Sequence, residues 1–112
     1  MTTKLIALEV ALELAEALGP GLDGLKSKNK NLADQAKRAL ASVALNLAEG
    51  NEHHDGNRGR HFRQARASVR ELAAALRLAR AFRDLSAAEV DRIWPLVDRL
   101  GALTYRLLHR RE

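Results

Sequence analysis

The chain has 112 residues, no cysteine, 4% aromatic residues and a formal net charge of +5. This length predicts one domain, residues 1–112, that is large enough to bury a core. The lack of cysteine excludes a disulfide framework and a thiolate metal site. No apolar run reaches about 18 residues, which excludes a membrane-spanning segment. We therefore expect a cytoplasmic protein that has no membrane partner.

The first predicted helix covers residues 3–18. It is expected to stop at Pro20, because proline cannot continue the backbone hydrogen-bond ladder of a helix. A loop that carries Lys26, Lys28 and Lys30 would follow it.

The second and third predicted helices cover residues 31–50 and 59–85. Gly50 would close the second helix, because glycine is favoured just past a helix end. Along the third helix apolar residues recur three and four positions apart, which is typical of a helix that packs in an antiparallel bundle. These core positions are Phe62, Ala65, Val69, Leu72, Leu76 and Ala79.

A fourth predicted helix, residues 86–109, begins with a capping pattern. The Ser86 side chain can accept a hydrogen bond from the Glu89 amide, and the Glu89 carboxylate can reach back to the Ser86 amide. No segment of the chain alternates with the period of two that a strand requires. The sequence therefore predicts an all-α fold, an up-down-up-down antiparallel four-helix bundle.

Positive charge is concentrated in the second half of the chain. Residues 1–57 hold six Lys and Arg against eight Asp and Glu, whereas residues 58–112 hold thirteen against six. Arginines form a stripe along the third helix, and their positive charges repel one another. A polyanion such as nucleic acid would relieve that repulsion. The candidate nucleic-acid-binding residues are Arg58, Arg60, Arg63, Arg66, Arg70 and Arg77, extended by Lys26, Lys28 and Lys30.

Two other interpretations of this stripe stay open. A solvated helix face accounts for it equally well. The second functional hypothesis is a protein-binding scaffold whose arginines meet an acidic partner. The nucleic-acid and scaffold hypotheses differ in whether the chain binds generic nucleic acid in a salt-dependent way.

Apolar residues also occur where a monomer would expose them. The first helix is apolar on most sides, which predicts burial on most sides, and self-association would supply that burial. The alternative is that alanine serves as a good helix former on an exposed surface. The candidate interface residues of a homo-oligomer are Leu8, Leu12, Ala67, Ala74 and Leu78.

A loop with His53, His54 and Asp55, followed by His61, offers side chains that can bind zinc or act as acid and base. A metal-dependent enzyme built on them is the third hypothesis. Adjacent side chains seldom converge on one ion, and the chain has no phosphate-binding glycine loop and no nucleophile elbow. We therefore predict no metal, no cofactor and no enzymatic activity.

Two stretches of the chain resemble a known family. "SVALNLAEG", residues 42–50, resembles the S-I-P-A-N-I-A-E-G signature of a bacterial four-helix bundle family. That family includes proteins encoded within intervening sequences of 23S ribosomal RNA genes and the accessory variability determinant of diversity-generating retroelements. Residues 62–79 are similar to its F-x-x-A-x-G-S-x-x-E-L stretch, although Ala44 and Ala67 stand where the family often has proline and glycine. The matching motif residues are Asn46, Glu49, Gly50, Ser68 and Glu71.

The resemblance implies a homopentamer without catalytic residues and, for the retroelement branch, binding to a reverse transcriptase and to nucleic acid. We interpret the motif as a polar network that fixes the turn between consecutive helices, with Glu71 accepting hydrogen bonds. Residues and resemblance together predict a non-enzymatic, oligomeric four-helix bundle that binds RNA or DNA. It would be either a 23S rRNA intervening-sequence protein or an accessory subunit of a reverse transcriptase.

Overall fold

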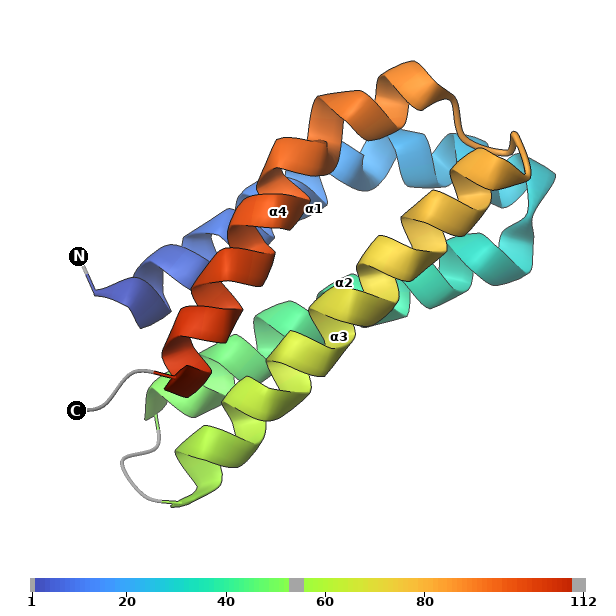
Figure 1. The fold of residues 1–112 in the computed structure, drawn as a ribbon. Coiled ribbons are helices and arrows are strands. Elements are labelled where there is room, and N and C mark those ends of the chain that lie inside the picture. The colour runs from blue at the N-terminus through green and yellow to red at the C-terminus, as the bar shows by residue number, and fades with distance from the viewer. Residues whose placement is uncertain (1, 53–55, 110–112) are drawn as a thin grey trace.

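In the computed structural model, which describes residues 2–52 and 56–109, the chain forms four helices (Figure 1). Each helix packs against its neighbour in the chain, and the last packs against the first. The described residues contain no strand, so the predicted all-α four-helix bundle is confirmed. Within those residues no helix is both long and apolar enough to cross a membrane. The helices are α1 (Thr3–Lys28), α2 (Lys30–Glu52), α3 (Gly56–Ala81) and α4 (Ala87–His109).

The core lies between the four helices. All six apolar positions predicted as core on α3 are buried. They form one cluster with fully buried side chains of the other helices, among them Leu14, Leu47 and Leu100. Burial of such a side chain contributes roughly 1.5–3 kcal/mol. The apolar seam therefore fixes the rotation of α3 about its own axis, and its opposite face points to solvent.

Helix α1 continues through Pro20, so the prediction that it ends there is wrong. Proline removes one hydrogen bond of the helix, but α4 supplies contacts at this point. The Arg92 guanidinium donates a hydrogen bond of 2.6 Å to the Ala17 carbonyl and pairs with Glu89 at 2.6 Å. Gly21 lets the Glu89 carboxylate approach, since a Cβ there would lie 2.7 Å from Glu89 Oε1. These contacts hold α4 against α1 on either side of Pro20.

Asn29 alone connects α1 to α2. Its side-chain oxygen accepts a hydrogen bond of 3.1 Å from the amide three residues on and so caps α2. Its side-chain nitrogen donates a hydrogen bond of 3.2 Å to Asp84, in the turn between α3 and α4. The predicted lysine loop is therefore wrong, because Lys26 and Lys28 lie in the last turn of α1 and Lys30 in the first turn of α2.

Gly50 lies inside α2, which continues to Glu52, so the prediction that this glycine closes the helix is wrong. Its role is close packing instead. The Phe62 ring of α3 lies directly against it, since a Cβ at Gly50 would lie 2.5 Å from Phe62 Cε1 and 2.8 Å from Cδ1. A side chain at this position would push α3 away from α2.

The turn between α3 and α4 contains Arg83, whose φ of 64° is left-handed. The Asp84 amide donates a hydrogen bond of 2.9 Å back into the last turn of α3, as in a helix C-cap. As predicted, Ser86 Oγ accepts a hydrogen bond of 3.1 Å from the Glu89 amide. The reciprocal bond of the capping box is not formed among the described residues, because the Glu89 carboxylate pairs with Arg92.

Gly50→Ala should destabilise the protein, although alanine favours a helix over glycine by about 1 kcal/mol. The added methyl group would overlap the Phe62 ring, and overpacking of this kind costs roughly 1–3 kcal/mol. Gly24→Ala is the matched control, because nothing lies within 4 Å of a Cβ at that exposed helical position. Urea unfolding followed by circular dichroism measures both variants. An equal gain in stability from the two substitutions would contradict the close contact.

Candidate nucleic-acid interface

The six arginines predicted to bind nucleic acid all lie on α3, which begins at Gly56. Arg60, Arg63, Arg70 and Arg77 are exposed, and the other two are half-buried. None of the four exposed arginines forms an ion pair with a carboxylate of a described residue. The helix therefore presents a row of positive charge that the described part of the chain does not neutralise.

Two arginines of α3 contact α4. The guanidinium carbon of Arg66 lies 5.6 Å from the centroid of the Tyr105 ring, and that of Arg77 lies 5.8 Å from the centroid of Trp94. Arg66 also donates a hydrogen bond to the Gly101 carbonyl. Arg66 thus contacts α4 and stabilises the packing of α3 against it, unlike the exposed arginines Arg60, Arg63 and Arg70.

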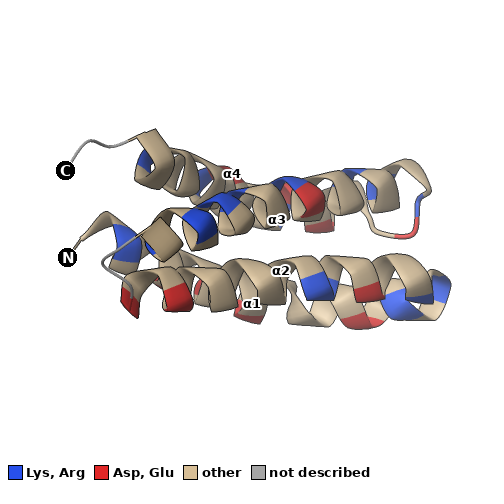
Figure 2. Ribbon diagram, turned by 90° about the horizontal axis from the view of Figure 1, so that it is seen from below, with Lys and Arg blue, Asp and Glu red and all other residues tan. Residues whose placement is uncertain are grey.

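The three predicted lysines lie at the far end of the bundle from the start of α3. They surround Asn29, which contacts Asp84 just after α3 ends. Arg58 lies in the first turn of α3, with its guanidinium carbon 5.5 Å from the centroid of Phe62. The long dimension of the bundle is 43 Å, and Figure 2 shows basic residues near both ends. The lysines therefore form a patch separate from Arg58 and its neighbours.

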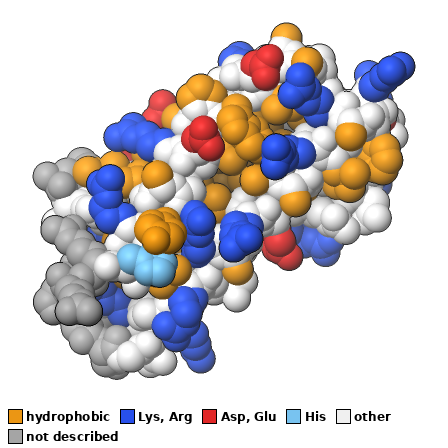
Figure 3. Space-filling view, viewed as in Figure 1, with side chains coloured by type: hydrophobic (Ala, Val, Ile, Leu, Met, Phe, Trp, Pro, Cys, Tyr) orange, Lys and Arg blue, Asp and Glu red, His pale blue; other side chains and the backbone are white. Residues whose placement is uncertain are grey.

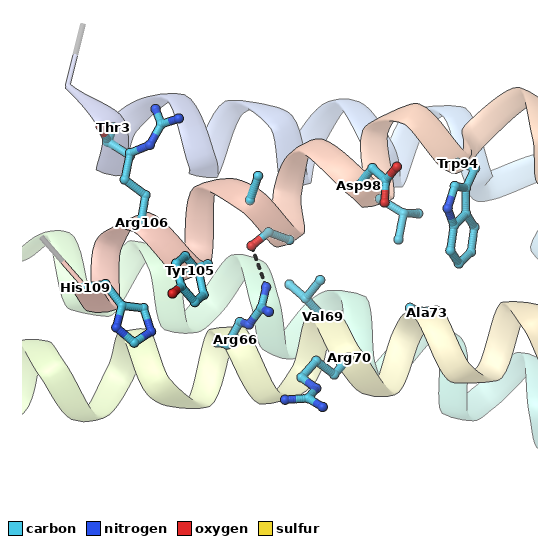
Figure 4. A pocket seen from close by; sticks show the side chains of 13 residues that line it. Thr3, Arg66, Val69, Arg70, Ala73, Trp94, Asp98, Tyr105, Arg106 and His109 are labelled. Atoms are coloured by element: carbon cyan, nitrogen blue, oxygen red, sulfur yellow. Dashed lines mark hydrogen bonds between the residues drawn. The ribbon is translucent and has the colours of Figure 1, made fainter.

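A groove of about 960 Å³ runs between α3 and α4. Val69, Ala73 and Gly101 contribute small apolar surfaces to it, and Trp94 and Tyr105 lie toward its two ends (Figure 4). On this face of the molecule Lys and Arg side chains, with some Asp and Glu among them, border a strip of hydrophobic side chains (Figure 3). The other lining residues are Thr3, Arg66, Arg70, Val97, Asp98, Ala102, Arg106 and His109.

The sequence prediction did not include the α4 side of this groove. Trp94 is half-buried and borders the groove, and Tyr105 is 53% exposed. A signal was present, because Trp94, Asp98, Gly101, Tyr105 and His109 recur three or four residues apart. Such spacing places them on one face of a helix, beside its buried seam.

A polar network joins α2 to α3. The hydroxyls of Ser42 and Ser68 share a hydrogen bond of 2.8 Å. Asn46 Nδ2 donates to the Ser42 carbonyl at 2.9 Å, and His61 Nδ1 donates to Asn46 Oδ1 at 3.0 Å. Gln64 Nε2 donates to Ser68 Oγ at 3.4 Å. The network spans about one turn of α2, from Ser42 to Asn46, and about two turns of α3, from His61 to Ser68. It therefore fixes the packing of the helix pair and not just the turn between them.

Three of the five motif residues make these contacts between α2 and α3. Asn46 and Ser68 belong to the network, and Gly50 contacts Phe62. The prediction that Glu71 accepts hydrogen bonds is wrong: its side chain is exposed and has no hydrogen-bond partner among the described residues. One turn beyond Ser68, this position faces solvent. Glu49 is also exposed.

The residues predicted for an oligomer interface differ in exposure. Leu8 is half-buried and packs against the core of its own chain. Leu12 is 47% and Leu78 45% exposed, and Ala67 and Ala74 are exposed as well. Four of the five are therefore available for association, which itself stays a prediction.

His53, His54 and Asp55 lie outside the described residues, so the predicted absence of a metal at this loop stays a prediction. His61 belongs to the polar network. Among residues 2–52 and 56–109, no three His, Asp or Glu side chains are grouped so that they could hold a metal ion.

These features define a class of protein: a small all-α bundle with a polar contact between its second and third helices and an arginine row on the third. The chain belongs to the 23S rRNA-intervening sequence protein family, whose family model matches residues 3–106. The resemblance seen in the two sequence stretches is thereby confirmed. No curated protein and no solved structure matches the chain.

Asn46→Ala should lower the free energy of unfolding by about 1–3 kcal/mol, because it leaves the His61 ring nitrogen without its acceptor. Glu71→Ala, an exposed motif position outside the network, should change stability by less than about 0.5 kcal/mol. Thermal and urea unfolding of both variants measure the difference. A larger loss from Glu71→Ala than from Asn46→Ala would contradict the network.

Proposed function

We propose that this chain is a non-enzymatic nucleic-acid-binding protein that contacts phosphates through the exposed arginines of α3. The observation that carries the proposal is the row of Arg60, Arg63 and Arg70, which are exposed and form no ion pair among the described residues. A guanidinium presents planar, bidentate donors that match phosphate oxygens. Bound polyanion would also relieve the repulsion between neighbouring arginines.

Membership of the 23S rRNA-intervening sequence family supports an RNA-related role. A reverse-transcriptase partner rests on the sequence resemblance alone and is not part of the proposal. Since contacts to phosphates do not read base edges, binding is expected to be largely independent of sequence. An acidic protein partner would satisfy the same arginines, and it becomes the favoured reading if nucleic acid does not bind.

We further propose that the chain forms a homo-oligomer, with the pentamer implied by the resemblance as the expected number. Leu5 and Leu12 of α1 and Leu45 of α2 are 45%, 47% and 66% exposed. These two helices form the side of the bundle away from the α3–α4 groove (Figure 1). Association through them leaves the arginines exposed, and each added subunit repeats the row, so that weak phosphate contacts multiply.

Light scattering at micromolar concentration should give a mass several times the 12.4 kDa of the chain. The double variant Leu12→Glu, Leu45→Glu should shift the protein toward monomer, because burying unpaired carboxylates in an apolar interface is costly. Phe82→Glu is the control, since Phe82 is 58% exposed and lies in the turn after α3. A monomeric wild-type protein would contradict the proposed assembly.

Replacement of Arg60, Arg63 and Arg70 by glutamine should weaken nucleic-acid binding and flatten its salt dependence. Each neutralised phosphate contributes roughly −0.7 to −0.9 to the slope of log affinity against log salt, so three lost contacts should reduce the slope by about two to three. Arg66 is left in place because it holds α3 against α4. Salt titrations of RNA and DNA binding measure the change.

The variant Lys26→Gln, Lys28→Gln, Lys30→Gln is the matched control. It removes the same number of positive charges from the other end of the bundle and should reduce the slope less. Equal loss from the two variants would attribute binding to total charge instead of to α3. A wild-type protein that does not bind at low salt would contradict the proposed function.

A further inference from the structure

The α3–α4 groove has a small apolar floor, and it is large enough to hold a flat ligand. Val69 and Ala73 contribute from α3, and Gly101 contributes no side chain from α4. A Cβ at Gly101 would lie 3.5 Å from an Arg66 guanidinium nitrogen. The volume of about 960 Å³ is in the range of sites that bind small organic molecules.

Two aromatic rings border this floor. Trp94 and Tyr105 are the only tryptophan and tyrosine of the chain, and eleven helical residues place them about 16 Å apart. Tyr105 lies between His109 and Arg66 (Figure 4), with the Tyr105 and His109 ring centroids 4.0 Å apart. Arg77 lies over the Trp94 ring at 5.8 Å. These neighbours hold both rings in place before any ligand binds, and a base that stacks on a covered ring face replaces the side chain that lies over it.

Positive charge borders the groove from both helices. Arg66 and Arg70 of α3 and Arg106 of α4 line it, with Asp98 as the one carboxylate among the lining residues. Asp98 forms no ion pair with a described arginine. The groove therefore combines apolar surface and two partly exposed aromatic rings with net positive charge.

From this combination we infer that the groove binds unpaired bases of a single-stranded nucleic acid, so that the chain prefers single strands to duplexes. Bases lie against the floor and the rings of Trp94 and Tyr105, while their phosphates meet Arg70 and Arg106. The inference rests on the proposed function and adds to it the type of strand and the place where bases bind.

Stacking on the aromatic rings would make a single strand bind in the groove more tightly than a duplex. In a duplex the bases stack on one another and their faces are covered, so a duplex offers this groove only its phosphates. In a single strand the faces are available, and aromatic rings beside a basic groove are the common means of holding them. A stack on one ring strengthens binding by about five-fold or more.

Trp94 fluorescence tests the inference, because this residue is the only tryptophan of the chain. The probes are an oligo(rU) strand, whose bases stack little on one another, and the duplex of the same length that it forms with oligo(rA), both at low salt. The single strand should quench Trp94 and bind about five-fold more tightly or better than the duplex. The duplex should bind without quenching.

Substitutions at Tyr105 separate stacking from charge. Tyr105→Leu should lower single-strand affinity about five-fold or more and leave duplex affinity unchanged. Tyr105→Phe should keep the affinity, because stacking needs the ring and not the hydroxyl. Phe82→Leu is the matched control, since this exposed aromatic residue does not line the groove.

The outcomes are distinguishable. Equal affinity for strand and duplex without quenching would overturn the inference and leave the proposed function in place. Equal loss of strand and duplex binding in Tyr105→Leu would overturn it too, because the ring would then act through the arginines. If neither probe binds, the inference and the proposed function both fail.

Discussion

The contact between α2 and α3 determines where every arginine of the candidate interface points. Gly50 lets the Phe62 ring lie against α2, and the hydroxyls of Ser42 and Ser68 meet at 2.8 Å two turns farther along. These contacts and the apolar seam lock the rotation of α3. A shift of one residue in that rotation would turn each side chain by about 100° and bring arginines into the core.

Helix α3 therefore has three faces: one packs against α2, one contacts α4 and one is exposed to solvent. Its Phe62 and Ser68 face α2, Arg66 crosses to the Gly101 carbonyl of α4, and Arg63 and Arg70 face solvent. An arginine that bonds a backbone carbonyl in a half-buried site stabilises the bundle, whereas one that stays exposed keeps its donors for a partner. The same residue type thus has two roles on one helix, set by its position relative to the seam.

The sequence predicted the elements that depend on local pattern. The three-and-four spacing of apolar residues identified the buried positions of α3, and the Ser86 cap of α4 was predicted from local sequence. The predicted helix ends were wrong where contacts with a segment distant in the sequence determine the local structure. Pro20 is accommodated because Arg92 and Glu89 of α4 contact α1 there, and Gly50 packs against Phe62 where a helix end was expected.

Site residues could be predicted where their position depends on one helix, and could not where it depends on how two helices pack together. The arginine row follows from the rotation of α3 alone. The groove requires the relative position of α3 and α4, so Tyr105 and Trp94 could not be assigned to it from the sequence. Glu71 was placed in the polar network by motif spacing, but spacing does not give the direction of a side chain at the edge of a helix contact, and it is exposed.

A map of the bound strand on the protein tests most directly whether nucleic acid binds to α3 and α4. Single-stranded RNA labelled with thiouridine, cross-linked to the wild-type chain by light and analysed by mass spectrometry, gives that map. Cross-links are expected on α3 and α4, around Arg70, Trp94 and Tyr105. Cross-links confined to α1 and α2, with none on α3 or α4, would contradict it.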